Sequence, residues 1–299
     1  MLSMSRLTLV ALLALYGTTA LGCPCGCGAV NAQVMNPGES WRFATSMAMD
    51  TGFETIDFRG QASDDVGPEV KNTFTLGVAR AFSRDFSGTL TLQSHRNSHS
   101  EEVDNYSIGD PSVSLRWTAY SQSFVRPYIP QLQVFGTYKH PVAKSTYDQD
   151  YGVRQMEIHG NGLAELVGGV DIWWGMDSLK YGITQSLIKP LKRRFTLDGG
   201  DLEVDPGLGY KTSLSGAYNM MAVGTVLVSI DREEREPLHI NGVKRADSEI
   251  LVHSGSVMAS LKVGFMRTVG LTYKRTAAFA ENRNTTRAHS VTVSYMEAL

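Results

Sequence analysis

Beyond residue 22, the sequence has no apolar run that approaches the roughly twenty residues a membrane-spanning helix needs. Charge is also scarce, because charged residues make up 19% of the chain and the net charge at pH 7 is −2. These shortages exclude a helical membrane protein and a nucleic-acid-binding protein, since the latter needs a basic face. Disorder is excluded as well, because 42% of the residues are apolar and their burial can offset chain entropy.

Residues 1–22 have the pattern of a bacterial secretory signal. Arg6 supplies the positive n-region, residues 7–16 form the apolar h-region, and Ala20-Leu21-Gly22 is a small-residue cleavage site. Such a segment is too short to act as a membrane anchor. We therefore expect residues 1–22 to be removed during export.

Cysteine is confined to one short segment. Cys23, Cys25 and Cys27 are the only cysteines, and three thiols within five residues cannot staple a fold. Thiolates at this spacing suit a soft ion such as Cu(I) or Zn(II), which makes a metal site one hypothesis. The alternative is a lipidated Cys23 beside a labile pair, because Ala20-Leu21-Gly22-Cys23 partly resembles a lipoprotein signal. In either case, residues 23–38 are expected to form a periplasmic tail.

From residue 39 onward, apolar residues recur at every second position, as in strands with one apolar and one polar face. Residues 256–265 are the clearest example, because Val257, Ala259 and Leu261 share one face and mainly polar residues share the other. About twelve segments show this period, at 39–50, 71–82, 86–97, 109–121, 126–140, 158–174, 178–190, 202–213, 219–231, 249–265, 268–279 and 287–297.

The connections between these segments alternate in length along the chain. Long connections cover residues 51–70, 98–108, 141–157, 191–201, 232–248 and 280–286, and short ones cover 83–85, 122–125, 175–177, 214–218 and 266–267. Antiparallel strands with short turns at one end and longer loops at the other are typical of bacterial outer-membrane barrels. A soluble β-sandwich has no reason to keep this alternation.

Residues 39–299 are therefore expected to form an all-β, closed antiparallel transmembrane barrel of about twelve strands in the outer membrane of a Gram-negative bacterium. Its short turns and both termini are expected in the periplasm, and its longer loops outside the cell. The expected partners are outer-membrane lipids, the outer-membrane assembly machinery and a small-molecule solute.

Aromatic residues gather at the short-turn ends of the predicted strands. An interfacial aromatic girdle on the periplasmic side of a barrel has this distribution. The predicted girdle consists of Phe82, Phe86, Tyr120, Phe124, Tyr128, Trp173, Trp174, Tyr218, Phe265 and Tyr295.

Charged residues lie on the polar faces of the predicted strands. An Arg or Lys on the lipid face costs about 2–4 kcal/mol at the midplane, so these residues are expected to face the lumen. The predicted lumen-facing set is Arg42, Arg116, Lys139, Glu165, Asp171, Lys180, Asp205, Lys211, Lys262 and Lys274. Basic residues outnumber acidic ones in this set, which favours a mildly anion-selective lumen. The run of charges over residues 231–236 is interpreted instead as a salt-bridged loop.

Two stretches carry a family resemblance. Residues 81–92, AFSRDFSGTLTL, and residues 108–117, IGDPSVSLRW, resemble the outer-membrane barrels of the MetA-pathway of phenol degradation family. In that family, a turn-aromatic-strand unit precedes a Gly-Asp unit whose strand ends in Arg-aromatic. The resemblance covers chiefly residues 70–140, and it implies a channel or transporter for small, hydrophobic molecules with no catalytic residues.

The predicted function is a channel or transporter with a narrow lumen, because eight strands leave an interior filled by side chains and sixteen leave an aqueous channel. Its solutes would be small molecules, with hydrophobic solutes and, if the cysteines bind metal, solutes linked to metal handling among the candidates. One alternative is a structural or adhesive surface protein with a plugged lumen. A second is an outer-membrane phospholipase-like enzyme, with His95 beside Ser94 and His159 beside Asn161. A non-enzymatic role is favoured, because no nucleophile and base can be paired and no catalytic residue is assigned.

The predicted lumen charges yield a test of ion selectivity. If Lys262 and Lys274 face the lumen, their joint replacement, Lys262→Glu with Lys274→Glu, should reverse the ion preference. Reversal potentials measured across planar bilayers under a salt gradient report this change. Unchanged selectivity would contradict an anion-favouring lumen.

Overall fold

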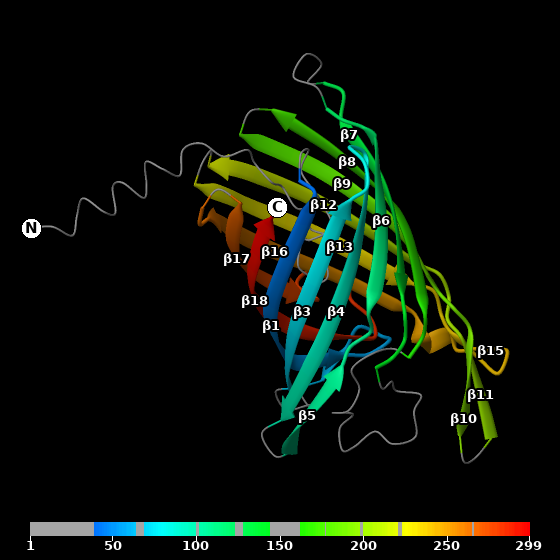
Figure 1. Cartoon of the computed structure of the whole chain (residues 1–299). Coiled ribbons are helices and arrows are strands. Elements are labelled where there is room, and N and C mark those ends of the chain that lie inside the picture. The colour runs from blue at the N-terminus through cyan, green and yellow to red at the C-terminus, as the bar shows by residue number, and fades with distance from the viewer. Residues whose placement is uncertain are drawn as a thin grey trace, which may run out of the picture.

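A sheet whose strands alternate by twos can close on itself, so that its backbone groups are hydrogen-bonded all the way round. The computed structural model describes residues 39–63, 69–99, 102–122, 128–143, 162–176, 178–197, 200–220, 223–264 and 266–299. These residues form a closed antiparallel barrel of twelve strands, which confirms the predicted fold (Figure 1). Among the same residues, no helix is long and apolar enough to cross a membrane.

The wall strands follow one another around the barrel in chain order. They are β1 (Trp41–Ile56), β3 (Glu69–Ala81), β4 (Phe86–His99), β5 (Glu102–Ile108) together with β6 (Ser112–Tyr120), β7 (Gln131–Lys139), β8 (Glu165–Met176), β9 (Leu179–Pro190), β12 (Gly209–Met220), β13 (Gly224–Arg235), β16 (Ile250–Lys262), β17 (Arg267–Thr276) and β18 (Thr285–Ala298). β18 pairs with β1 from Arg42↔Ala298 to Ile56↔Thr285, and this pairing closes the ring.

The two faces of each strand differ in exposure. In β6, Leu115 and Trp117 point outward and are 47% and 52% exposed, whereas Ser114 and Arg116 point inward and are 6% and 5% exposed. The other wall strands repeat this division, with apolar residues outside and small or polar residues inside. The outer face is thus suited to lipid and the inner face to a polar lumen.

One position in the wall is occupied by two strands in succession. β5 pairs with the half of β4 nearer the long loops, β6 pairs with the other half, and Gly109-Asp110-Pro111 lies between them. A Cβ at Gly109 would overlap the imidazole of His95, so glycine allows the chain to pass this ring. Asp110 is buried, and its Oδ1 accepts hydrogen bonds of 2.9 Å from the backbone N–H groups of Val142 and Ala143. The Gly-Asp-Pro segment therefore links the wall to the chain that follows β7.

A small four-stranded sheet extends from the long-loop end of the barrel (Figure 1). Its strands are β10 (Arg193–Leu197), β11 (Gly200–Asp205), β14 (His239–Ile240) and β15 (Val243–Lys244), and η2 (Ala246–Ser248) follows the last of them. Asn241 and Gly242 join β14 to β15 with φ values of 51° and 79°, the left-handed pair that a two-residue hairpin requires. Leu163, Phe195 and Val204 form the buried cluster beneath this sheet.

The predicted wall strand over residues 202–213 is wrong, and so is the predicted turn over residues 214–218. β11 belongs to the outer sheet, the wall strand β12 begins at Gly209, and residues 221–223 connect β12 to β13. The error arises because an exposed hairpin that covers a small apolar cluster alternates by twos just as a wall strand does. Asp205, predicted to face the lumen, therefore lies in the outer sheet, where it pairs with His239.

The charged run over residues 231–236 is not a loop. β13 continues to Arg235, with Asp231, Glu233 and Arg235 on the inner face and exposed Arg232 and Glu234 on the outer face. Because alternate residues of this run face opposite sides, its two-residue period could have predicted a strand. The high density of charge favoured a solvated loop instead.

A pair of adjacent glycines tests the inward packing. A Cβ at Gly169 would overlap the Phe135 ring and lie 2.7 Å from the carbonyl oxygen of Gln185, whereas a Cβ at Gly168 meets nothing within 4 Å. Gly169→Val should therefore destabilise the barrel by about 1–3 kcal/mol through overpacking. The matched control Gly168→Val should leave stability unchanged or raise it, because valine favours strands. Urea unfolding of the barrel in lipid vesicles measures both variants, and equal losses would contradict this packing.

Candidate functional site

The inner face of the barrel carries most of the charges that the sequence singled out. The strand registers place on this face Arg42, Arg116, Lys139, Glu165, Asp171, Lys180, Lys211, Lys262 and Lys274. Of the predicted set, Asp205 is the exception described above. Their part in solute passage stays a prediction.

Hydroxyl groups make up much of the rest of the inner face. The buried hydroxyl residues are Ser46, Thr75, Thr89, Thr91, Ser114, Thr184, Ser186, Ser213, Ser215, Thr225, Ser229, Ser254, Ser290 and Thr292. Some bond across neighbouring strands, as Ser114 Oγ does with Thr137 Oγ1 at 2.7 Å and Ser229 Oγ with Ser256 Oγ at 2.8 Å. The interior is therefore polar between its charges as well.

A buried cluster on β6, β7 and β8 contains an ion pair between its own residues. Arg116 forms an ion pair with Asp171, which is 0% exposed, and Nη1 of Arg116 also donates to Gln133 Oε1 over 2.9 Å. The guanidinium carbon lies 5.1 Å from the centre of the Phe135 ring, and that ring covers Gly169. These groups lie along the inner wall on three adjacent strands. Because the two charges pair with each other, the cluster presents little net charge to a passing solute.

A second ion pair joins two strands that are not neighbours. Arg235 of β13 donates from Nη1 to Glu165 Oε1 of β8 over 3.0 Å, and from Nε to Glu233 Oε1 over 2.8 Å. β9 and β12 lie between β8 and β13 in the wall. At the level of Arg235, β12 carries Gly209, where a Cβ would lie only 3.3 Å from Arg235 Cγ. The missing side chain lets the arginine cross above β12.

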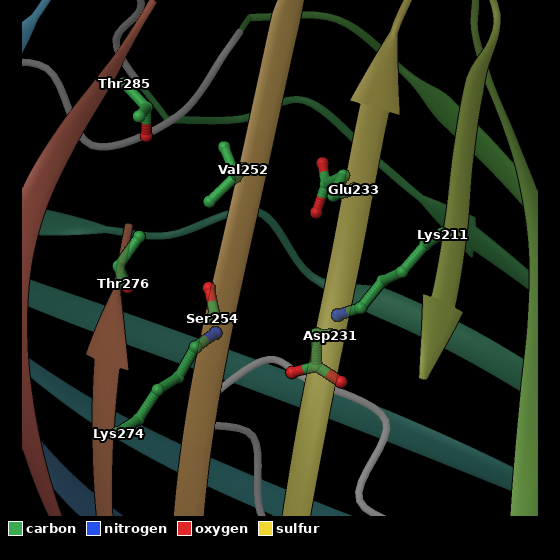
Figure 2. A pocket seen from close by; sticks show the side chains of 8 residues that line it. All are labelled: Lys211, Asp231, Glu233, Val252, Ser254, Lys274, Thr276 and Thr285. Atoms are coloured by element: carbon green, nitrogen blue, oxygen red, sulfur yellow. The ribbon is translucent and has the colours of Figure 1, made fainter. Parts of the chain in front are cut away.

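The charges between β12 and β17 line a pocket of about 180 Å³ on the inner wall (Figure 2). Lys211 of β12, Asp231 and Glu233 of β13 and Lys274 of β17 contribute to it, together with Ser254 of β16. Asp231 is 4% exposed, and its Oδ1 atom is buried without a hydrogen-bond partner among the described residues. Both lysines were predicted from the sequence to face the lumen, but these acids were not, because the charged run over residues 231–236 resembles a loop.

Charge in the outer sheet is organised separately. Glu203 of β11 accepts from Lys192 Nζ over 2.6 Å and from Arg194 over 3.4 Å. The hydrogen bond from Lys192 is the main reason why the pKa of Glu203 lies below its usual range. Lys192 and Arg194 are exposed, Glu203 is half-buried, and all three lie outside the barrel wall.

The predicted aromatic girdle is found mainly on the outer face near the short connections. Exposed there are Phe82, Phe86, Tyr120, Tyr128, Tyr218 and Tyr295, and the rings of Trp174 and Tyr181 stack at 5.6 Å. Tyr120 reaches this face because a register shift between Thr118 and Tyr120 breaks the alternation of β6. Phe124 and Phe265 lie outside the described residues.

Trp173 is a correction to that girdle. Its ring lies against Gly182 on the inner face of β9, where a Cβ would overlap the indole. Adjacent residues of a strand face opposite sides, so only one of Trp173 and Trp174 can point toward lipid. Exposed tyrosines also mark the long-loop end, at Tyr138, Tyr210 and Tyr273.

The remaining candidate sites are only partly described. Cys23, Cys25 and Cys27 lie outside the described residues, as do His159 and Asn161. Within the described part of the chain, no three His, Cys, Asp or Glu residues cluster so that they could hold a metal ion. Ser94 and His95 point to opposite faces of β4, and buried His95 Nδ1 lies 3.0 Å from Thr73 Oγ1, so these two residues do not form a nucleophile–base pair.

No family model matches the sequence, and no curated protein matches it. An outer membrane channel from Pseudomonas putida F1 is similar in structure, with a TM-score of 0.74 and 11% identity over 89% of this chain and 97% of that one. The CymD monoaromatic hydrocarbon channel gives a TM-score of 0.48 at 11% identity, over 90% of each chain. The NanC porin also gives 0.48, at 9% identity, over 85% of this chain and 100% of the porin. The first likeness shows that this chain has the fold of an outer-membrane channel barrel.

The Arg116–Asp171 pair allows a test of the buried cluster. Arg116→Met leaves Asp171 buried without its partner, so the variant should lose about 3–5 kcal/mol of unfolding free energy. The double variant Arg116→Met with Asp171→Leu removes both charges and should recover most of this loss. Urea unfolding in lipid vesicles gives the values. A double variant no more stable than the single one would show that the two charges do not act as a pair.

Proposed function

We propose that this chain is an outer-membrane channel through which small solutes pass. The observation that carries the proposal is the contrast between an apolar outer face and an inner face lined by hydroxyls and charges. A polar interior is suited to contact with water and polar solute, whereas an apolar outer band is suited to lipid. The likeness in fold to the Pseudomonas putida outer membrane channel supports the same proposal.

The chemistry of the lumen favours polar solutes. The resemblance of residues 81–92 and 108–117 to the MetA-pathway family favours hydrophobic solutes instead. Passage of hydrophobic solutes is therefore the competing proposal. Large apolar side chains such as Phe135 and Leu227 do occur on the inner face, but hydroxyls and charges outnumber them among the described residues. We therefore infer that small hydrophilic molecules, rather than hydrocarbons, are the main solutes.

The orientation proposed is short connections and both termini in the periplasm. It is supported by the ends of the described chain, since Ser40 N donates to Leu299 O over 2.8 Å at the end with short connections. In this orientation the cysteine tail would lie at the periplasmic mouth. Capture of a soft metal ion by Cys23, Cys25 and Cys27 remains a proposal. Equal copper stoichiometry in the mature protein and a triple Cys→Ser variant would refute it.

Reconstitution tests the channel directly. The purified chain should give discrete current steps in planar bilayers and should let liposomes swell in isosmotic solutions of small polar solutes. Liposomes without protein and liposomes with heat-unfolded protein are the controls. A folded barrel, identified by its heat-modifiable mobility in gels, that gives neither signal would instead support a plugged surface protein. Hydrolysis of phospholipid in a calcium-containing assay would support the enzyme alternative.

A further inference from the structure

The pocket between β12 and β17 has the size of a small-molecule site. Its volume is about 180 Å³, and a cavity of about 150 Å³ is large enough to hold benzene. It lies on the inner wall toward the long-loop end, since β12 begins at Gly209, β13 ends at Arg235 and β17 ends at Thr276. A solute that enters from this end would meet the pocket before the middle of the lumen.

Asp231 supplies an acceptor that no described group satisfies. Its Oδ1 is buried and makes no hydrogen bond, although Ser213 and Ser254 face it across the neighbouring strands. The other acid of the pocket, Glu233, already has a partner, because its Oε1 accepts a hydrogen bond of 2.8 Å from Arg235 Nε. A buried carboxylate oxygen requires a donor, and a solute with a cationic N–H group would supply one.

The lysines supply the complementary charge. Lys211 and Lys274 approach the pocket from its two sides, and Figure 2 shows the ammonium end of Lys211 reaching toward Asp231 and that of Lys274 lying beside Ser254. Two lysines and two acids make the lining formally neutral. A solute with a single net charge would disturb this balance, whereas a molecule with one charge of each sign would preserve it while pairing with both kinds of group.

We propose that this pocket binds a small zwitterionic solute, whose ammonium group donates to Asp231 and whose anionic group pairs with Lys274 and Lys211. The inference rests on the proposed channel function, because it makes the pocket a selectivity site on the path of the solute. It narrows the solute class to compact molecules of the amino-acid type.

Current block in planar bilayers tests the site. The full chain is reconstituted, and glycine is compared with glycolamide, a neutral molecule with the same number of heavy atoms. Glycine should reduce the potassium chloride current in a saturable manner, and glycolamide should need at least a tenfold higher concentration. Block is expressed as a fraction of each variant's own open current, so that changes in conductance do not enter the comparison.

Two variants and one control locate the effect. Asp231→Asn keeps the shape but removes the negative charge, and Lys274→Met removes the opposite charge. Each should raise the half-blocking concentration of glycine at least tenfold and leave that of glycolamide unchanged. Asp201→Asn, an exposed change in the outer sheet, should alter neither value. Heat-modifiable gel mobility confirms that each variant is folded.

The outcomes separate the two proposals. Current steps without preferential glycine block, or an unchanged block in Asp231→Asn, overturn the zwitterion site and leave the channel in place. A folded wild-type chain that gives no current overturns the channel and, with it, a selectivity site on its path. Loss of glycine block in both Asp231→Asn and Lys274→Met, with Asp201→Asn unaffected, supports the site.

Discussion

The pairing of β18 with β1 is the interaction on which the rest of this structure depends. Inside a bilayer there is no water to hydrogen-bond an open sheet edge, so a membrane-spanning sheet must close. The pairing runs the length of β1 from Arg42↔Ala298 to Ile56↔Thr285, with one register shift between Gly52 and Glu54. Closure then fixes an inside and an outside, and each residue's place in the two-residue alternation decides which of them it faces.

This division explains how the interior tolerates its charges. Arg116 bonds to Asp171 and Gln133 along the wall, and Arg235 forms ion pairs with Glu165 and Glu233 nearer the loops. Such pairing limits the cost of removing each charge from bulk water. The lumen therefore consists of neutralised patches separated by hydroxyls. Asp231 lines the pocket between β12 and β17, and one of its buried oxygens has no hydrogen-bond partner among the described residues.

The sequence was sufficient to predict the barrel, its strand number and most inward charges, because all three depend on a period of two. It failed where another structure has the same period or breaks it. β11 alternates like a wall strand although it lies outside the barrel, and this misplaced β12 and Asp205. Tyr120 lies on the outer face, as its place in the predicted girdle requires, but it gets there through a register shift that no local pattern signals. Assignment of Trp173 to the inner face needed the register against Gly182, which depends on contacts distant in sequence.

The Arg235–Glu165 pair has a mechanical consequence for the rim of the barrel. The backbone ladders between neighbouring strands fix the circumference of the ring but not the shape of its cross-section. A link from β13 to β8 spans an arc of the wall and fixes the length of the chord beneath it. With that chord fixed, the arc formed by β8, β9, β12 and β13 cannot flatten without breaking the link. Gly209, by leaving room for the arginine, makes this stretch of the rim stiffer than hydrogen-bonded strands alone could make it.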